Sequence, residues 1–460
     1  MVGTARIVIA APASGHGKTT VATGLIAAFA RRGRRVAPFK VGPDYIDPGY
    51  HALAAGRPGR NLDPFLLGES RTAGLFAHGS AGADIAIVEG VMGLYDGAVG
   101  RGEFASTAQV ATLIGAPVIL VVDATAQGRS VAALVDGFRG FDRRVRIAGV
   151  ILNRVGSERH RDILASALDE IGVPLLGTLH RSDAVATPSR HLGLVPVAER
   201  APDALATVDA LADLITQNID LDRVERIAAS AKAGDGAVAA WSPEDAIAEL
   251  GGPTAGRRPV VAVAGGAAFT FSYAEHAELL AAAGAEVVTF DPLHDAKLPE
   301  RASALVIGGG FPEVYASALA ENKSLLDDVR GFVDCGGVIA AECAGLLYLA
   351  RSLDGVAMCG VIDAEAVMTE RLTLGYREAV AATDSVLCDA GMRVNGHEFH
   401  RTTLTPASSD GPAWMWRAHN GAAVAEGYAS ARLHASYLHL HWAGAPELPR
   451  RLVAAAGSAR

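Results

Sequence analysis

A run of small residues near the N-terminus constrains this chain more than any other feature. It spans residues 11–20 (APASGHGKTT), follows an apolar run over 6–10 and precedes an apolar, helix-like run over 20–29. A strand, a small-residue loop ending in Gly-Lys-Thr and a helix form a phosphate-binding P-loop. Pro12 replaces the first glycine of the usual pattern. The structural alternative is a tight strand-to-helix turn that carries a surface lysine.

The P-loop pattern predicts a nucleotide site. Backbone N–H groups of such a loop, together with the start of the following helix, bind phosphate. Lys18 is expected to reach the outer phosphates and the Thr19 hydroxyl to bind Mg²⁺. The residues expected to bind ATP here are Ser14, Gly15, Gly17, Lys18, Thr19 and Thr20.

The composition excludes several classes of protein. Lys and Arg total 41 and Asp and Glu total 50, so the net charge is −9, which argues against nucleic-acid binding. The chain has no uninterrupted apolar run of the roughly 18 residues that a membrane span needs. Its four cysteines form no CxxC pair, so neither a zinc site nor a disulfide framework is indicated. We expect a reducing cytoplasm as its location.

The arrangement of apolar runs predicts an α/β fold. In the first half, strand-like runs alternate with helix-like runs, which is typical of a parallel sheet covered on both faces. A second α/β pattern begins near residue 259, after a stretch rich in turn residues. The chain is therefore expected to divide into a P-loop domain, a linker, a second α/β domain and a frayed tail, at residues 1–230, 231–257, 258–447 and 448–460.

Polar residues follow several strands of the first half, where parallel sheets bind their ligands. Asp44 lies in a Gly-Pro loop that also presents Asp47, and a carboxylate there is a candidate Mg²⁺ ligand, with Lys40 a candidate for an anionic substrate. Glu89 ends an apolar strand, as a Walker-B acid does. Asn153 is a candidate for reading adenine. The alternatives are turn or helix-capping roles.

Cys343 is the candidate nucleophile of the second half. A strand-like run, a sharp turn at Cys343 and a helix-like run resemble a nucleophile elbow. The helix dipole is expected to lower the pKa of the thiol, and nearby N–H groups are expected to form an oxyanion hole. The alternative is a buried, inert cysteine. The other three cysteines have no such context and are expected to be structural.

A thiol nucleophile needs a base, and His439 and His441 lie downstream in a strand-like run. Residues two apart in a strand point to the same face, so spacing does not choose between them. Residues 308–310 (GGG) follow a strand and are expected to supply a second oxyanion N–H. Residues 395–400 are expected either to border the substrate site or to form an ordinary turn.

These motifs together resemble the cobyrinic/hydrogenobyrinic acid a,c-diamide synthases of cobalamin synthesis. The resemblance covers nearly the whole chain and rests on residues 11–20, 39–51, 89–97, 308–313, 342–345 and 437–441. It implies a P-loop domain of the dethiobiotin-synthetase type followed by a class I glutamine amidotransferase domain. Class I domains usually carry Glu two residues after the catalytic His; His441 stands there, so the third member of the triad is open.

The resemblance also implies a mechanism. Cys343, helped by His439, would release ammonia from glutamine. ATP with Mg²⁺ would phosphorylate a corrin carboxylate, and ammonia would displace the phosphate, on the a and the c acetate side chains. By the resemblance Thr19, Asp44 and Glu89 serve the metal, Asn153 the adenine, and Lys40, Asp44, Ile46 and Asp96 the substrate. A locally basic groove that includes Lys40 is expected for this polycarboxylate.

Three alternatives remain at this stage. Cobyric acid synthase shares both modules but amidates other side chains. A P-loop regulatory ATPase would carry an inactive second half, but such ATPases often have an additional lysine early in the loop, and residues 11–16 contain none.

The composition resembles that of high-GC aerobic bacteria and favours the metal-free substrate, hydrogenobyrinic acid, over cobyrinic acid. A homodimer is left open.

Overall fold

The chain folds into two compact units, Met1–Trp241 and Ser242–Arg460. The computed structural model describes residues 3–181, 189–190, 193–194, 197, 201–231, 239–254, 258–418 and 420–458. The division falls within the expected linker, of which 232–238 and 255–257 lie outside the described residues. α10 (Pro243–Ala248) forms in the same stretch. No helix in the described part of the chain is long and apolar enough to cross a membrane.

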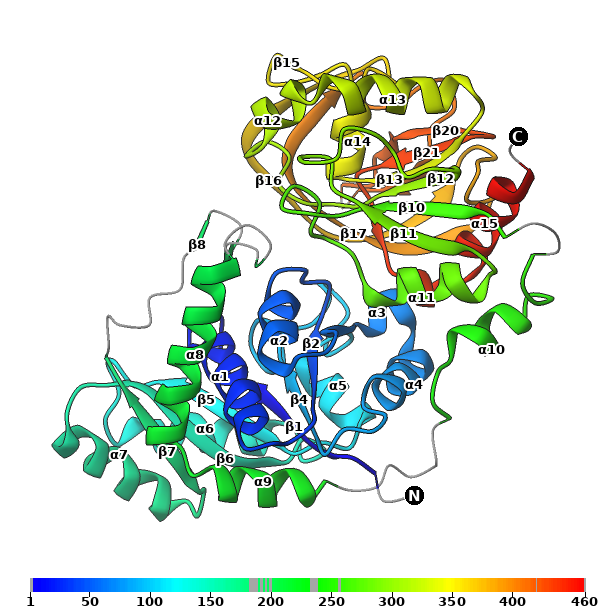
Figure 1. Cartoon of the computed structure of the whole chain (residues 1–460). Coiled ribbons are helices and arrows are strands. Elements are labelled where there is room, and N and C mark those ends of the chain that lie inside the picture. The colour runs from blue at the N-terminus through cyan, green and yellow to red at the C-terminus, as the bar shows by residue number, and fades with distance from the viewer. Residues whose placement is uncertain are drawn as a thin grey trace. The chain divides into compact units, whose positions relative to one another are not determined.

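The first unit is built on a seven-stranded parallel sheet in the order β3-β2-β4-β1-β5-β6-β7 (Figure 1). Its strands are β1 (Ala5–Ala10), β2 (Val36–Val41), β3 (Arg60–Leu62), β4 (Ile85–Glu89), β5 (Val118–Asp123), β6 (Ile147–Val155) and β7 (Leu175–His180). A two-stranded ribbon adds β8 (Ser189–Arg190) and β9 (Gly193–Leu194).

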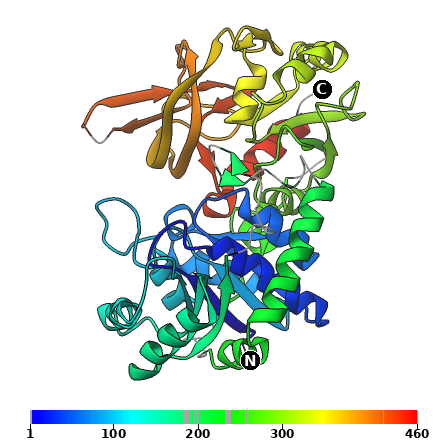
Figure 2. The ribbon, with the colours of Figure 1, turned by 90° about the vertical axis from the view of Figure 1, so that its left-hand side faces the viewer.

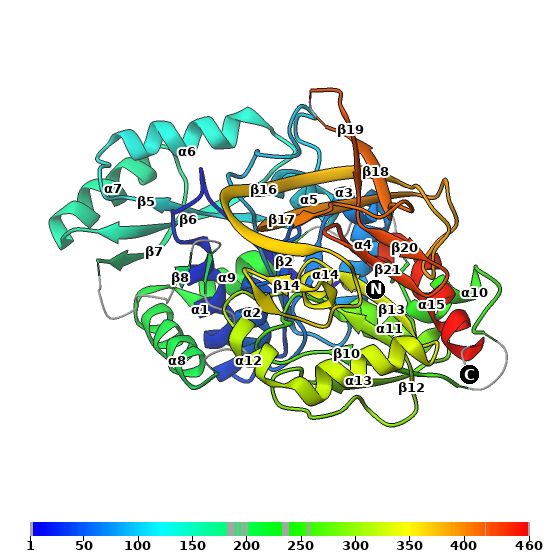
Figure 3. The same ribbon diagram turned by 90° about the horizontal axis from the view of Figure 1, so that it is seen from above.

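Helices cover both faces of this sheet. Seen from above, α6 and α7 lie on one side of β5, β6 and β7, and α1 and α8 lie on the other (Figure 3). The helices are α1 (Lys18–Arg31), α2 (Asp47–Ala55), α3 (Pro64–Leu67), α4 (Glu69–Gly79), α5 (Thr107–Leu113), α6 (Ser130–Phe141), α7 (Glu158–Glu170), α8 (Ala201–Asn218) and α9 (Leu221–Ala229). Because both faces are covered, the central strands are buried along almost their whole length.

The expected parallel sheet is confirmed, with its strands where the apolar runs place them. β1, β2, β4, β5, β6 and β7 all overlap strand-like runs in the sequence, and β7 begins and ends two residues later than its run. The short edge strand β3 was not expected, because three residues are too few to show a pattern.

The second unit combines two sheets. One has six strands in the order β11-β10-β12-β13-β21-β20, all parallel except the β20–β21 pair. Its strands are β10 (Val260–Ala264), β11 (Glu286–Phe290), β12 (Ala302–Ile307), β13 (Val338–Glu342), β20 (Tyr428–Ser430) and β21 (Leu433–Ser436). Its helices are α11 (Ala274–Ala282), α12 (Ala316–Glu321), α13 (Lys323–Asp334), α14 (Ala344–Leu349) and α15 (Glu447–Ser458), with a 3-10 turn at Trp442–Gly444.

The other sheet is centred on the long antiparallel pair β16–β17 (Figures 2 and 3). Beside β16 it is extended by β18, which pairs in turn with β19. Its strands are β14 (Ser352–Leu353), β15 (Val356–Ala357), β16 (Glu365–Ala381), β17 (Arg393–Thr405), β18 (Trp414–Arg417), β19 (Ala423–Glu426) and β22 (His439–Leu440). The sequence did not predict this sheet, because charged and polar residues interrupt the apolar residues of β16 at irregular spacing and the strand is only partly buried. Residues 395–400, expected to be an edge or a turn, lie inside β17.

The C-terminal segment differs from the frayed end that the sequence indicated. Residues Glu447–Ser458 form α15, and Leu448, Leu452 and Val453 are fully buried. Leu452 lies four residues after Leu448 and Val453 follows it directly, which places the three side chains on one face of a helix. The segment therefore contributes to the core of the second unit.

Close packing of α1 against α8 depends on a glycine, and this gives a stability prediction. A Cβ on Gly24 would lie 2.9 Å from the carbonyl oxygen of Leu211 and would overlap Ile215. Gly24→Ala is expected to lower the free energy of unfolding of the first unit by about 1–3 kcal/mol, because α8 must move away. Thermal denaturation of the purified chain measures the effect.

The matched control is Gly137→Ala in α6, where a Cβ meets nothing within 4 Å. There the substitution is expected to raise the free energy of unfolding by up to about 1 kcal/mol, since alanine favours a helix more than glycine does. Equal melting temperatures for the two variants would contradict this account of the α1–α8 contact.

Candidate functional site

The P-loop connects β1 to α1. Gly15 and Gly17 have φ values of 83° and 95°, which favour glycine, and a Cβ on Gly17 would overlap the side-chain amide of Asn153. Lys18 begins α1, and its Nζ donates to the carbonyl oxygens of Ala13 (3.1 Å) and Met92 (2.5 Å). Burial and, after it, the nearby Lys40 lower the pKa of Lys18 to about 8. A buried ammonium next to backbone carbonyls at a helix start suits an incoming phosphate.

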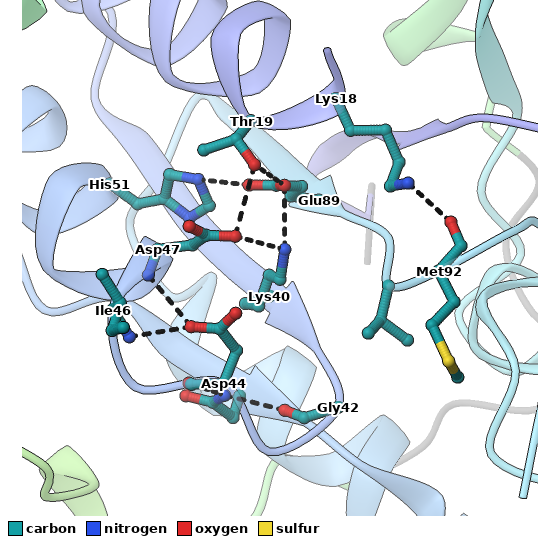
Figure 4. A network of polar contacts seen from close by, with 12 residues as sticks. Lys18, Thr19, Lys40, Gly42, Asp44, Ile46, Asp47, His51, Glu89 and Met92 are labelled. Atoms are coloured by element: carbon teal, nitrogen blue, oxygen red, sulfur yellow. Dashed lines mark hydrogen bonds and ion pairs between the residues drawn. The ribbon is translucent and has the colours of Figure 1, made fainter. Parts of the chain in front are cut away.

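A buried polar network lies beside the P-loop (Figure 4). Lys40 Nζ donates to Asp47 Oδ2 at 2.6 Å and to Glu89 Oε1 at 2.8 Å. The Thr19 hydroxyl donates to the same Glu89 oxygen at 2.6 Å and lies 3.3 Å from Asp47 Oδ2. Lys40, Asp47 and Glu89 are all buried. Four elements therefore converge here: the ends of β2 and β4 and the starts of α1 and α2.

His51 completes this network from α2. Its Nε2 lies 2.8 Å from Glu89 Oε2, and both side chains are fully buried. Burial alone would raise the pKa of Glu89, but the charge of Lys40 and the hydrogen bond from His51 outweigh it and hold that pKa below its usual value. Burial and the nearby Asp44 carboxylate raise the pKa of Asp47. Glu89 is thus the firmly ionised carboxylate of the network.

The network has the donor set that a hard divalent cation prefers. Two carboxylates lie within 3.3 Å of one hydroxyl, and the ammonium of Lys40 bonds to both carboxylates. Mg²⁺ in nucleotide sites binds one or two carboxylates and completes its shell with phosphates and water. No cluster of three His, Cys, Asp or Glu side chains that could hold a metal by themselves occurs among the described residues. The residues that fit Mg²⁺ here are Thr19, Asp47 and Glu89.

Asp44, the carboxylate that the sequence favoured as a metal ligand, has a different position. Its Oδ1 accepts the backbone N–H groups of Ile46 at 2.7 Å and of Asp47 at 3.0 Å, so it caps the turn that leads into α2. The structure therefore brings Asp47, and not Asp44, to Thr19 and Glu89. Asp44 as a metal ligand finds no support in these contacts.

Lys40 and Ile46 also differ from the expected open groove. Lys40 is 4% exposed and fully engaged by two carboxylates, and Ile46 is 5% exposed. Neither side chain forms a surface for a large anionic ligand in this structure. The reason is electrostatic, because a lysine between two buried acids is held by both of them.

Asp96 and Asn153 lie at other loops of the same sheet edge. The exposed Asp96 accepts a hydrogen bond from the N–H of Gly93 at 2.9 Å. Its negative charge acts to raise the pKa of Lys18. Asn153 donates to the carbonyl oxygen of His16 at 3.0 Å and accepts the N–H of Arg154 at 2.9 Å. Asn153 therefore braces the P-loop backbone here, and its expected contact with adenine is a prediction that these bonds do not support.

Cys343 occupies the strand-to-helix turn that the sequence indicated. It follows β13 directly and precedes α14, with φ 46° and ψ −101°, a strained conformation for a residue with a side chain. Its N–H donates to the carbonyl oxygen of Ser436 at 2.7 Å, and the Gly345 N–H donates to that of Gly308 at 3.0 Å. A Cβ on Gly345 would overlap the backbone of Ile307. This is the geometry of a nucleophile elbow.

The thiol of Cys343 does not have the lowered pKa that the sequence suggested. Burial and, after it, the charge of Glu313 raise that pKa, and the backbone N–H of Ala344 offsets them only in part. The residue is 4% exposed, and α14 has only six residues, so the helix dipole is weak beside the cost of desolvation. Sγ lies 4.0 Å from the carbonyl oxygen of Phe399. The proton therefore stays on sulfur until a base removes it.

The two candidate histidines face different acids. His439 Nδ1 lies 3.8 Å from Glu342 Oε2, and His441 Nε2 lies 3.6 Å from Glu275 Oε2. Only His439 belongs to β22, and its neighbouring acid is the residue just before Cys343. These contacts favour His439 over His441 as the candidate base, because the acid beside His439 directly precedes Cys343.

The expected oxyanion glycines lie next to this histidine. A Cβ on Gly309 would meet His439 Cε1 and the ring of Phe271. The Gly309 N–H, however, donates to the carbonyl oxygen of Phe271 at 3.2 Å, so this group is already bonded in the present structure. The loop fits closely around the imidazole, which accounts for glycine at this position.

Three residues of these sites escaped the sequence prediction. Asp47 was noted with Asp44 but was not assigned to the metal; His51 follows Asp47 by four residues, which places both on one face of α2. That i,i+4 spacing could have indicated the pair. Glu342 precedes the nucleophile directly, but sequence adjacency gives no information on which histidine it meets.

Comparison with known families matches both units separately. Residues 7–195 match the CobQ/CobB/MinD/ParA nucleotide binding domain, and residues 260–447 match the CobB/CobQ-like glutamine amidotransferase domain. The solved chloroplast FtsY of Physcomitrella patens covers 45% of this chain and 65% of its own at 18% identity, with a TM-score of 0.30, which is too low to support an argument.

Relatives with assigned names match almost the whole chain. The hydrogenobyrinate a,c-diamide synthase of Streptomyces coelicolor is 57% identical, over 97% of this chain and 96% of its own length. That of Mycobacterium bovis is 52% identical over 97% of each chain, and the cobyrinate a,c-diamide synthase of Synechococcus is 41% identical over 96% of each. The chain therefore belongs to the hydrogenobyrinate/cobyrinate a,c-diamide synthase family, a group of amidating ligases with a glutamine amidotransferase domain.

Proposed function

We propose that this chain uses ATP and glutamine to convert the a and c carboxylates of hydrogenobyrinic acid into amides. The observation that carries the proposal is the pairing, in one chain, of the P-loop network with the Cys343 elbow. The metal-free substrate is favoured because the hydrogenobyrinate enzymes are 52–57% identical to this chain and the cobyrinate enzymes are 40–44% identical.

The second unit would release ammonia from glutamine. His439 takes the proton of Cys343 as sulfur bonds to the side-chain amide carbon, and then gives that proton to the departing nitrogen. The C–N bond breaks, leaving a thioester and ammonia. Water, deprotonated by the same imidazole, hydrolyses the thioester to glutamate and restores the thiol. A neutral buried thiol requires this base catalysis, which is consistent with its raised pKa.

The first unit would activate the corrin carboxylate. A carboxylate oxygen attacks the γ-phosphorus of ATP, ADP leaves, and an acyl phosphate forms. Ammonia then attacks the acyl carbon and phosphate leaves, which yields the amide. Lys18 holds the outer phosphates, and the P-loop N–H groups offset their charge. Activation is needed because a free carboxylate is too poor an electrophile for ammonia.

Thr19, Asp47 and Glu89 would hold Mg²⁺, which supplies charge stabilisation at the transferring phosphoryl group. Lys40 adds a positive charge beside this set, and His51 fixes the Glu89 carboxylate from the far side. Roles for Asp44, Ile46 and Asp96 in substrate binding remain predictions, as do the cytoplasmic location and the homodimer.

The substrate assignment is tested by incubating the chain with ATP, Mg²⁺ and glutamine and either hydrogenobyrinic or cobyrinic acid. Hydrogenobyrinic acid is expected to gain two amides, detected by mass spectrometry, with a kcat/KM at least about 10-fold above that for cobyrinic acid. Preference for the cobalt-containing acid would contradict the assignment. Amidation at other side chains would indicate the cobyric acid synthase alternative.

Cys343→Ala should reduce glutamine-dependent amidation by at least about 10³-fold, since no other group in the elbow can form the thioester. Amidation with ammonium salts should persist, because the activating site is intact. Cys335→Ala, at an exposed free cysteine, is the matched control and should retain both activities. Undiminished glutamine use by Cys343→Ala would exclude the thiol mechanism.

The metal set is tested by comparing two Asp→Asn substitutions three residues apart. Asp47→Asn should raise the Mg²⁺ concentration for half-maximal ammonia-dependent activity by about 10-fold or more, because it removes a carboxylate from the cation site. Asp44→Asn should leave that concentration within about 2-fold, since asparagine can also accept the two N–H bonds. A larger rise in the required Mg²⁺ concentration for Asp44→Asn than for Asp47→Asn would indicate that Asp44, and not Asp47, binds the metal.

A further inference from the structure

Glu342 has an unusual place in the second unit. It is the last residue of β13, it is paired in register with Ser436 of β21, and Cys343 follows it directly. Its carboxylate Oε2 lies 3.8 Å from His439 Nδ1. The side chain of His439 is fully buried, and that of Glu342 is 13% exposed. The acid, the imidazole and the nucleophile therefore belong to one small region of the fold.

His441, two positions after His439, contacts a different acid. His441 Nε2 lies 3.6 Å from Glu275 Oε2, and both side chains are fully buried. The His441 ring stacks on Tyr273, with ring centroids 4.2 Å apart. His441 begins the turn at Trp442–Gly444, whereas His439 pairs with His397 of β17. His400 and Glu398 of β17 form a third buried pair, with Nε2 3.6 Å from Oε1, and Glu398 is also held by Arg377 at 2.6 Å. Among the Glu–His pairs of the described part of this unit, the Glu342 pair is the one whose acid directly precedes the nucleophile.

An anion at this position would favour the thiol step. Burial raises the pKa of Cys343, so the proton passes to the imidazole during attack, and a cation then forms on the fully buried His439 side chain. A carboxylate at Nδ1 stabilises that cation and directs Nε2 to the thiol. Burial also raises the pKa of Glu342. The hydrogen bond and the charge of the nearby His439 lower that pKa and offset the effect of burial in part. Catalytic hydrogen bonds are often long in ligand-free enzymes and tighten in the substrate complex.

We propose that Glu342 is the positioning residue of His439 and so completes the thiol site from the position directly before the nucleophile. The inference rests on the proposed glutaminase activity of the second unit. It places the acid of the triad on β13, and not two residues after the histidine. Glu275 and His441 then form a separate structural pair.

The test compares Glu342→Gln with Glu275→Gln in the full chain. Glu342→Gln should lower the kcat for glutamine hydrolysis by about 10- to 10³-fold while the KM for glutamine changes by less than about 2-fold, because the imidazolium loses its stabilising charge. Ammonia-dependent amidation should be unchanged. Glu275→Gln makes the same change in a second Glu–His pair, which is fully buried, and the kcat of this variant should stay within about 2-fold of wild type.

The outcomes separate this inference from the proposed function. A wild-type chain with no glutaminase activity would contradict both. An active wild type with an unimpaired Glu342→Gln, or an equal loss in Glu275→Gln, would overturn the role of Glu342 alone. If Glu342→Gln fails to fold, Glu342→Asp is measured instead: a fall in kcat with unchanged ammonia-dependent activity supports the proposal, and an unchanged kcat overturns it.

Discussion

The ammonium of Lys40 is the contact on which the site of the first unit depends. It bridges Asp47 and Glu89, and Thr19 bonds to the same Glu89 oxygen. Burying this many charges is costly unless each has a partner, and removing one partner typically costs about 3–5 kcal/mol. The ends of β2 and β4 and the starts of α1 and α2 are consequently held in one arrangement, which is the arrangement that presents the P-loop to a nucleotide.

The candidate site of the second unit differs, because its central group is buried without a charge. Cys343 is buried in its neutral form, and its raised pKa means that the charged state arises only during turnover. The strained backbone at φ 46° is maintained by bonds to Ser436 and by the close approach of Gly345 to β12. Rigid backbone contacts thus fix the sulfur, while in the proposed mechanism a proton transfer to His439 produces the charges that catalysis needs.

The sequence predicted the parts of each site that follow from one local pattern. Lys18 and Cys343 lie where a strand, a turn and a helix in succession must place them, and both positions agree with the structure. The choice between Asp44 and Asp47 depended on which of them caps α2, a detail of side-chain direction that loop composition does not encode. The β16–β17 pair was missed because its stability comes from cross-strand packing of mixed residues, which has no clear periodic signature.

Glu89 and Glu342 occupy equivalent positions, since each is the last residue of an interior parallel strand and each lies beside a buried histidine. Their surroundings differ in one respect. Glu89 has a permanent cation in Lys40, which holds its pKa low, whereas burial leaves the pKa of Glu342 raised. A carboxylate that is always ionised suits a resident cation. A carboxylate whose ionisation depends on its neighbour suits a cation that exists only while a proton is on the imidazole. Under the two proposed roles, the same strand-end position serves two kinds of chemistry, and the partner that the fold places beside the acid determines which one.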